Sequence, residues 1–464
     1  MALEAWSLGL TARDTGLRSA STRDPLGFEI IWTTFGGQAI PALSTVSRGM
    51  ASFCALVAHT WCVDTWLEQT ELTSRVLQAH SPIRLRLMMA LESLHAFAVA
   101  STTSPGDPRR RNLPGIDSAA ALLADHDTAS LHVGLDAEHD VLVNQPGMGI
   151  NGRYRRPLMN AREPLLDEHG HLHPHPADAR WAMLRDDYAE LREEAWRLFD
   201  ALTAARAFRV PLDDPAARAL MEQSVTLRDM RRNTALAAQL TEAFGLHLES
   251  GTLHRALFEL LDPAAHNDAA RLYRQALDHI DSEAFRDTIA DAATRAEHRA
   301  KLNDVIALEE ILWRVDVIFD RLWQRDLSPE LFTVEGPAGP ADLLAELGER
   351  REDLARLRER ARRHRSNALK RRLEALARLL DQTDDWLGFL QFLVHTLHAE
   401  VVIQGRSGST PWVALEGRRA RVLNGGHSPA PDRLGWRRSY YIPTLVEFCR
   451  DARLSEAEPG GEPT

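Results

Sequence analysis

The sequence is short of lysine and cysteine, and both shortages exclude classes of chemistry. Only two of its 464 residues are lysines, Lys301 and Lys370, and neither follows a glycine, so no Gly-x4-Gly-Lys phosphate-binding loop is present. A Schiff-base mechanism therefore has few candidate lysines. The three cysteines, Cys54, Cys62 and Cys449, supply neither a Cys-x-x-Cys zinc pattern nor a disulfide framework.

Leader sequences, long apolar runs and common catalytic motifs are lacking as well. Residues 1–14 have no basic start and no apolar run, which argues against a signal peptide. The most apolar region, residues 39–66, contains Arg48 and His59 and is not expected to span a bilayer. Gly-x-Ser-x-Gly and His-Glu-x-x-His are absent. We expect a cytoplasmic chain with no membrane partner and no cofactor.

What the chain does contain is a local excess of positive charge within an acidic protein. The net charge is −11, but residues 356–372 hold eight arginines and one lysine against a single acid, Glu359. Such a segment can track phosphates or an acidic partner surface. The alternative is a solvated helix pair, because leucines repeat at helical spacing from Leu369 to Leu380. The candidate binding residues are Arg356, Arg358, Arg360, Arg362, Arg363, Arg365, Lys370, Arg371 and Arg372.

The hydrophobic periodicity predicts a mainly α-helical protein of several parts. In residues 177–334 one stripe at helical spacing, which includes Leu312 and Phe319, is expected to face inward in a bundle. Residues 400–406, 410–417 and 418–423 are predicted as short strands that form a β-hairpin region, and residues 455–464 as a disordered tail. The expected segments are an N-terminal helical region (1–105), a winged-helix-like α/β segment (106–176), a helical bundle (177–334), arginine-rich long helices (335–399) and the C-terminal part (400–464).

Residues 165–176, LLDEHGHLHPHP, carry histidine at every second position. Alternating residues of a strand point to one side, so His169, His171 and His173 are alternative candidates for zinc ligands. The preferred interpretation is simpler, because no partner ligand stands nearby in the sequence. A helix, a short strand at Leu165, a polar turn, a returning strand and a further helix outline an exposed winged-helix wing.

Three further patterns suggest metal or phosphate sites but are incomplete. Glu92 and His95 form one helical Glu-x-x-His motif, whereas a di-iron bundle needs two such motifs and two more glutamates. An acidic stripe, Glu309, Asp316 and Asp320, is expected to be a solvated helix face. The glycine-rich GMGING at residues 147–152 lacks a preceding strand and is interpreted as a flexible entry to the next helix.

Three stretches together resemble known proteins. DPLGFEIIWTTFGGQAIPALSTVSRGMASFC, NGRYRRPLMNAREPLLDEHGHLHPHPADARWAML and GWRRSYYIPTLVEFCRD are similar to segments of uncharacterised helical proteins from bacterial anti-phage defence islands, over about a third of the chain. The resemblance implies membership of a multi-protein defence system and transfers no active-site residue. Where such proteins carry Leu-Gly-Leu before the wing, this chain has Ala161-Arg162-Glu163-Pro164.

These observations favour a non-catalytic structural or adaptor subunit. It is expected to bind other subunits of the same system, with DNA as a further candidate partner. The alternative is a metal-dependent nuclease or hydrolase that uses the cluster from His169 to His175 together with scattered acidic residues.

Overall fold

The computed structural model is mainly α-helical in the part of the chain that it describes. None of the described helices is long and apolar enough to cross a membrane. The expected disordered tail lies outside the described residues, apart from its first two. The described residues are 24–40, 42–44, 46–70, 82–125, 130–134, 140–142, 144–205, 207–211, 215–230, 232–248, 252–260, 296–323, 341–404, 413–416, 419–422 and 442–456.

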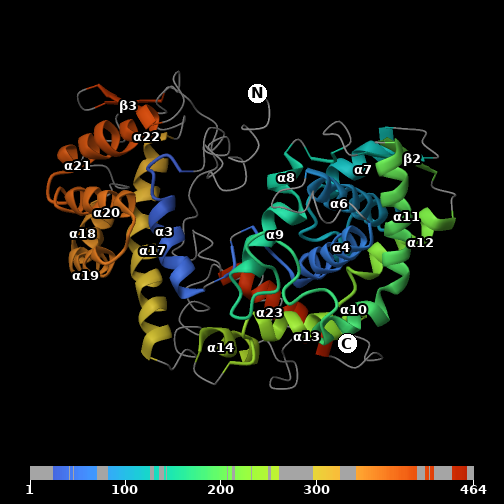
Figure 1. The fold of residues 1–464 in the computed structure, drawn as a ribbon. Helices are drawn as coiled ribbons and strands as arrows, with labels where there is room; N and C mark the ends of the chain where they lie inside the picture. The colour runs from blue at the N-terminus through green and yellow to red at the C-terminus, as the bar shows by residue number, and fades with distance from the viewer. Residues whose placement is uncertain are drawn as a thin grey trace. The chain divides into compact units, whose positions relative to one another are not determined.

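The described residues form two compact units that do not follow chain order (Figure 1). Unit 1 joins residues up to Ala39 to the part from α17 to β4, and unit 2 joins residues 40–248 to the C-terminal helix α23. This happens because α3 (Glu29–Ala39) packs on α17, whereas α23 (Ile442–Glu456) packs on α4 and α13. The expected segments 1–105, 177–334 and 400–464 therefore each contribute described residues to both units.

Unit 2 is built around α4 (Met50–Gln69), whose sequence has no polar face. Nearly all of its side chains are buried, as expected from the apolar run. Asp451 of α23 accepts a hydrogen bond from the Met50 N–H at 2.9 Å, which satisfies one of the free amides at the start of α4. The C-terminal helix thus fastens the first turn of the central helix.

The other elements of unit 2 surround α4. Helices α6, α9, α11, α13 and α23 contact it directly, and a two-stranded antiparallel sheet, β1 with β2, lies beside α6. The elements are α6 (Pro82–Thr102), α7 (Ile116–Asp125), β1 (Ser130–Gly134), α8 (Gln145–Met148), α9 (Ile150–Met159), α10 (Ala182–Asp187), α11 (Ala189–Ala205), β2 (Ala207–Pro211), α12 (Pro215–Thr226), α13 (Thr234–Ala243) and most of α14 (Leu253–Leu260), with 3-10 turns at Pro108–Arg110 and Ala179–Trp181.

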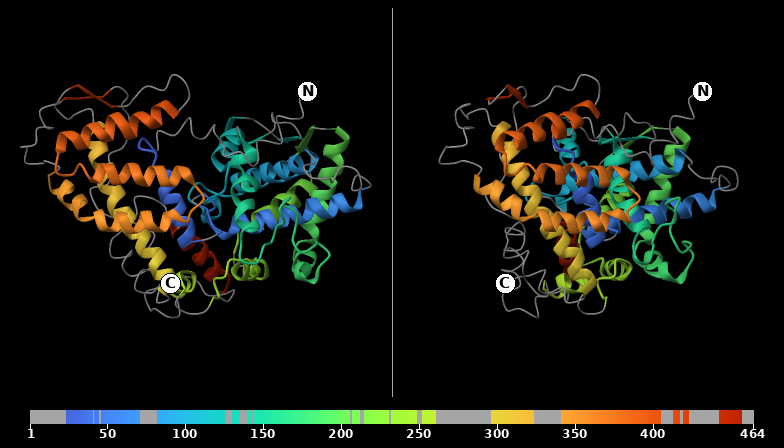
Figure 2. Two further views of the ribbon diagram at one scale, coloured as in Figure 1. Left: turned by 60° about the vertical axis from the view of Figure 1, so that its left-hand side comes forward. Right: turned by 90° about the vertical axis from the view of Figure 1, so that its left-hand side faces the viewer.

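Unit 1 is organised along α17 (Ala296–Trp323), with α18 to α22 grouped beside it in both views of Figure 2. The side chains of Leu312, Val315, Phe319 and Leu322 are at most 1% exposed, so the inward stripe is confirmed. The other helices are α18 (Ala341–Glu349), α19 (Arg351–Arg362), α20 (Asn367–Leu380), α21 (Trp386–Phe392), a π-helical turn (Leu393–His398) and α22 (Ala399–Gln404).

The predicted helical hairpin in the arginine-rich segment is present as α19 and α20. Ser366 begins α20, because its Oγ accepts a hydrogen bond from the Leu369 N–H at 3.2 Å. The repeating leucines of α20 are buried against the rest of unit 1, as expected. The leucine spacing therefore located both the helix and its packed face.

The strand prediction at residues 400–406 is wrong, because Ala399–Gln404 is helical. Val401 and Val402 favour a strand by propensity, but here they continue a helix that is already formed from Trp386 onward, and adding a residue to a formed helix is easy. The two later strands are β3 (Val413–Glu416) and β4 (Arg419–Val422), which pair antiparallel.

The expected wing is reduced to one bridge, Leu166 with Leu172, around the turn at residues 167–170. Helix α9 precedes it, and a 3-10 turn beginning at Ala179 follows it. A single bridge holds too few residues in strand geometry to line up the histidines on one side. The alternation of the sequence therefore does not become an alternation of faces.

Candidate functional site

Five of the nine candidate cations form ion pairs inside unit 1. Arg360 and Arg356 both reach the buried carboxylate of Asp304 on α17, the latter at 3.8 Å. Two others also pair across helices: Arg358 with Glu374, and the buried Arg372 with Glu400 at 3.1 Å. Within α19, Arg362 pairs with Glu359 at 2.6 Å. The four interhelical cations hold α17, α19, α20 and α22 together.

The position of Arg372 also explains why residue 27 is a glycine. Gly27 has φ +69°, and a Cβ there would lie 2.8 Å from the Arg372 guanidinium. The chain before α3 therefore passes directly over this side chain. Arg372 belongs to the interior of unit 1 rather than to a binding surface.

The remaining four cations lie at one end of the α19–α20 hairpin. Arg363 and Arg365 lie in the connection between the helices, and Lys370 and Arg371 follow close after the start of α20. The three arginines are exposed and Lys370 is half-buried. No described residue forms an ion pair with any of these four. We call Arg363, Arg365, Lys370 and Arg371 the cationic tip.

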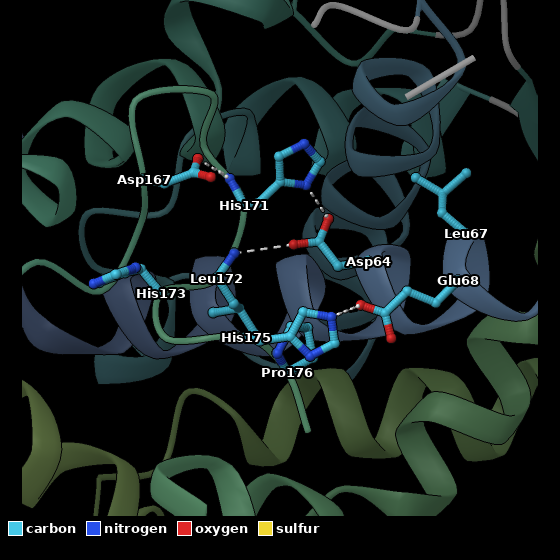
Figure 3. Close-up of a pocket in the computed structure, with 9 residues that line it drawn as sticks. All are labelled: Asp64, Leu67, Glu68, Asp167, His171, Leu172, His173, His175 and Pro176. Atoms are coloured by element: carbon cyan, nitrogen blue, oxygen red, sulfur yellow. Dashed lines mark hydrogen bonds and ion pairs between the residues drawn. The ribbon is translucent and has the colours of Figure 1, made fainter. Parts of the chain in front are cut away.

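The second candidate region is the histidine turn, residues 165–176 of unit 2. Its four histidines do not meet at a common point. His171 turns toward α4 and is half-buried, whereas His169, His173 and His175 are exposed. Figure 3 shows the His173 ring pointing away from Asp64, and His175 pairs with Glu68 at 2.9 Å. The interpretation as an exposed hairpin fits three of the four histidines.

Asp64 of α4 is the centre of this region, although it was not among the residues expected from the sequence. Its carboxylate accepts hydrogen bonds from Arg84 Nε at 2.9 Å, His171 Nδ1 at 3.1 Å and the Leu172 N–H at 3.0 Å. Burial opposes its ionisation, but the nearby Arg84 guanidinium and the bond to His171 keep the pKa of Asp64 below its usual value. The only sequence signal was an acid within the apolar part of a helix, four residues before the second acid, Glu68.

A pocket of about 310 Å³ lies between α4 and the histidine turn. Its polar lining comes from three carboxylates and three histidines (Figure 3). Among the residues that the structure describes, no group of three or more His, Cys, Asp and Glu side chains is placed to hold a metal ion. The lining residues are Asp64, Leu67, Glu68, Asp167, His171, Leu172, His173, His175 and Pro176.

The Glu-x-x-His motif is buried, but its two side chains contact different helices. Glu92 accepts a hydrogen bond from the Asn151 N–H in the first turn of α9, and burial raises its pKa to about 8. His95 contacts His59 of α4, with ring centroids 5.5 Å apart. Burial lowers the pKa of both imidazoles, that of His59 to about 3, so both are neutral at pH 7.

The glycine-rich stretch at residues 147–152 is a close-packed connection between α8 and α9, not the flexible entry that the sequence indicated. A Cβ on Gly149 would lie 2.2 Å from Glu92 Oε2, and one on Gly152 would lie 2.4 Å from the Pro146 carbonyl oxygen. Glycine is therefore required here so that Glu92 can approach the start of α9.

The acidic stripe on α17 was expected to be solvated, and this is wrong. Glu309, Asp316 and Asp320 are buried, at 0%, 2% and 5% exposure. Each of them interacts with other groups of the chain. The prediction failed because α17 is covered on more than one side within unit 1, which a periodicity argument for a half-exposed helix does not anticipate.

No protein-family model, curated protein or solved structure matches this chain.

Proposed function

We propose that this chain is an adaptor subunit that binds an acidic surface of a partner protein through the cationic tip. The observation that carries the proposal is the division of the cations in the arginine-rich segment into paired and exposed ones. Five of its nine cations have partners inside unit 1, and four gather at one exposed end without a described ion-pair partner.

The charge of the whole molecule favours a protein partner over a long nucleic acid. The net charge is −11, so a polyanion longer than the tip meets repulsion from the rest of the surface. A compact acidic patch on a protein meets the tip alone. Arginine forks can pair bidentately with carboxylates, which favours a defined orientation of the partner. The defence-system context rests on the sequence resemblance.

Fluorescence anisotropy with two probes tests the proposal: a labelled glutamate-rich peptide and a labelled duplex DNA of similar length. We expect the full chain to bind the peptide, with affinity that falls as salt rises. Replacing Arg363, Arg365 and Arg371 by Ala removes three exposed pairs of about 0.5–1 kcal/mol each and should weaken peptide binding about 10- to 100-fold.

A matched control has the same change in net charge. Arg197, Arg232 and Arg378 are exposed arginines that do not belong to the tip, and their replacement by Ala should leave peptide binding unchanged. Equal losses in the two triple variants would show that only net charge matters. Tight DNA binding with a log–log salt slope of roughly −0.9 per neutralised phosphate, lost in the tip variant, would assign the tip to nucleic acid instead.

A further inference from the structure

The pocket beside the histidine turn is independent of the cationic tip, because it lies within unit 2. Its volume of about 310 Å³ is at the lower end of the range for small-molecule sites. Part of its wall is apolar, from Leu67, Leu172 and Pro176. The ionised Asp64 and the half-buried His171 stand beside this wall (Figure 3). A buried charge, an imidazole and space for a ligand thus meet in one place.

The imidazole of His171 is held from several sides. Asp167 Oδ1 accepts a hydrogen bond from the His171 N–H at 2.9 Å, and Asp64 Oδ2 accepts one from the Leu172 N–H at 3.0 Å. On the other flank, Arg84 Nη2 donates to the Gly170 carbonyl oxygen at 2.6 Å. The backbone on both sides of His171 is therefore fixed, and the ring cannot turn away without loss of its bond to Asp64.

The contact with Asp64 also sets the tautomer of His171. An ionised carboxylate can only accept, so Nδ1 carries the proton and donates to Asp64 Oδ1 at 3.1 Å. In the neutral ring the other nitrogen, Nε2, then has a free lone pair, and no described residue forms a hydrogen bond with it. Figure 3 shows this nitrogen on the side of the ring away from Asp64. A carboxylate that orients a histidine in this way is the arrangement of a general base.

We propose that His171, positioned by Asp64, is a general base that activates water for the hydrolysis of a neutral carboxylic ester bound in this pocket. Nε2 takes a proton from water as the water oxygen bonds to the acyl carbon, and the π pair of the carbonyl moves onto the carbonyl oxygen to give a tetrahedral oxyanion. When that pair re-forms the carbonyl, the bond from the acyl carbon to the alcohol oxygen breaks, and the imidazolium gives its proton to the leaving oxygen. The products are a carboxylic acid and an alcohol, and no oxidant, reductant or further reactant is needed.

The lining of the pocket selects both nucleophile and substrate. The lining residues that the structure describes include no serine, threonine or cysteine, so the proposed nucleophile is water. Asp167 and Glu68 place negative charge on the wall, whereas the charge of Asp64 is matched by Arg84, so the lining disfavours phosphate esters and carboxylates. The apolar side chains suit a short acyl chain. Asp64 is a positioning residue, because its oxygens bind Arg84, His171 and the backbone rather than the substrate.

This inference departs from the expectation of a non-catalytic chain and does not rest on the adaptor role. It concerns residues of unit 2, whereas the cationic tip belongs to unit 1. The two proposals can therefore fail separately, since each has its own variants and its own assay.

Hydrolysis of p-nitrophenyl acetate by the purified full chain is the first test. We expect turnover above that of free imidazole at equal concentration, and none with p-nitrophenyl phosphate. His171→Gln should lower kcat/KM by at least about 100-fold, the lower limit for loss of a general base. His169→Gln is the matched control, because His169 lies in the same turn but does not line the pocket, and its rate should be unchanged. Added imidazole should restore part of the activity of His171→Ala.

Asp64→Asn tests the positioning role separately. The amide can donate to Nδ1, which moves the proton to Nε2 and removes the base, so kcat should fall while KM changes little. Circular dichroism reports whether each variant is folded, and His171→Gln decides the matter if Asp64→Asn is not. Absence of turnover in the unmodified chain, full activity in His171→Gln, or an equal loss in His169→Gln would each overturn the proposal.

Discussion

The histidine turn and the arginine-rich hairpin are both dense in polar groups, but they differ in how many of these groups are paired with neighbouring elements. In the turn, one buried carboxylate, Asp64, draws His171 and Arg84 inward, while the other histidines stay exposed. In the hairpin, cations on the helix faces are paired with acids of neighbouring helices, and those near the connection are left outside. Proximity to a neighbouring element, rather than residue type, decides which charge is structural.

The comparison also separates two kinds of buried charge. Asp64 has a nearby guanidinium and three hydrogen bonds, and its pKa lies below the usual value. Asp304 of α17 is also paired with arginines, but burial still raises its pKa. Glu92 forms no ion pair with a described residue, and burial raises its pKa to about 8. The variants below test these differences, from the largest expected effect to the smallest.

Asp64→Ala should be the most damaging of these variants. It leaves the Arg84 guanidinium, whose side chain is 12% exposed, without its acid and the Leu172 N–H without an acceptor. Loss of one partner of a buried pair costs about 3–5 kcal/mol of unfolding free energy, measured by urea denaturation. Glu68→Ala, which breaks the exposed pair with His175, should cost less than about 1 kcal/mol. Equal costs would mean that the Asp64 network is not a buried one.

Glu92→Gln should change the pH dependence of stability. The folded chain keeps the Glu92 proton up to about pH 8, whereas the unfolded chain releases it above about 4.5. Between these values the folded state binds more protons, so the unfolding free energy falls as pH rises, by up to about 1.4 kcal/mol per pH unit from this group.

The glutamine variant cannot ionise and should lack that contribution. Chemical denaturation of both proteins from pH 5 to pH 8 gives the difference. Other groups, such as His59, titrate equally in both proteins and cancel. Parallel curves for the two proteins would contradict a raised pKa for Glu92.

Arg360→Ala should have a smaller effect, because the arginine is partly solvated. Its side chain is 41% exposed, but its partner Asp304 is only 4% exposed and retains the more distant Arg356. We expect a loss of about 1–2 kcal/mol, between the values for exposed and buried pairs. Arg363→Ala in the cationic tip should stay within about 0.5 kcal/mol of the unmodified protein. Thermal unfolding that ranks Arg363→Ala as the worse variant would reverse the assignment of inner and outer cations.

Much of the helical structure could be predicted because its signal is local. The stripe from Leu312 to Leu322 and the leucines of α20 are buried as their spacing indicated. The strand expected at residues 400–406 failed because propensity was weighed without the helix that precedes it. The wing failed because residue alternation does not say how many residues will pair.

The candidate sites were predicted only in part. The arginine-rich segment was visible in the sequence, but the separation into paired cations and a cationic tip was not. Asp304 is 56 residues from Arg360, and Asp64 is 107 residues from His171. The GMGING stretch was noticed for its glycines, yet their reason, the approach of Glu92, comes from a different helix.

The sequence by itself determined the helical class, the packed faces of α17 and α20 and the presence of a cation-rich hairpin. It could do so because a helix closes its hydrogen bonds four residues apart and repeats every 3.6 residues, so the information is contained in short windows. Only the tertiary structure decided that Asp64 holds His171, that Glu92 meets the start of α9 and that four of the nine cations remain outside. Those choices depend on which distant elements meet and on the burial that results, because burial decides whether a charge must find a partner.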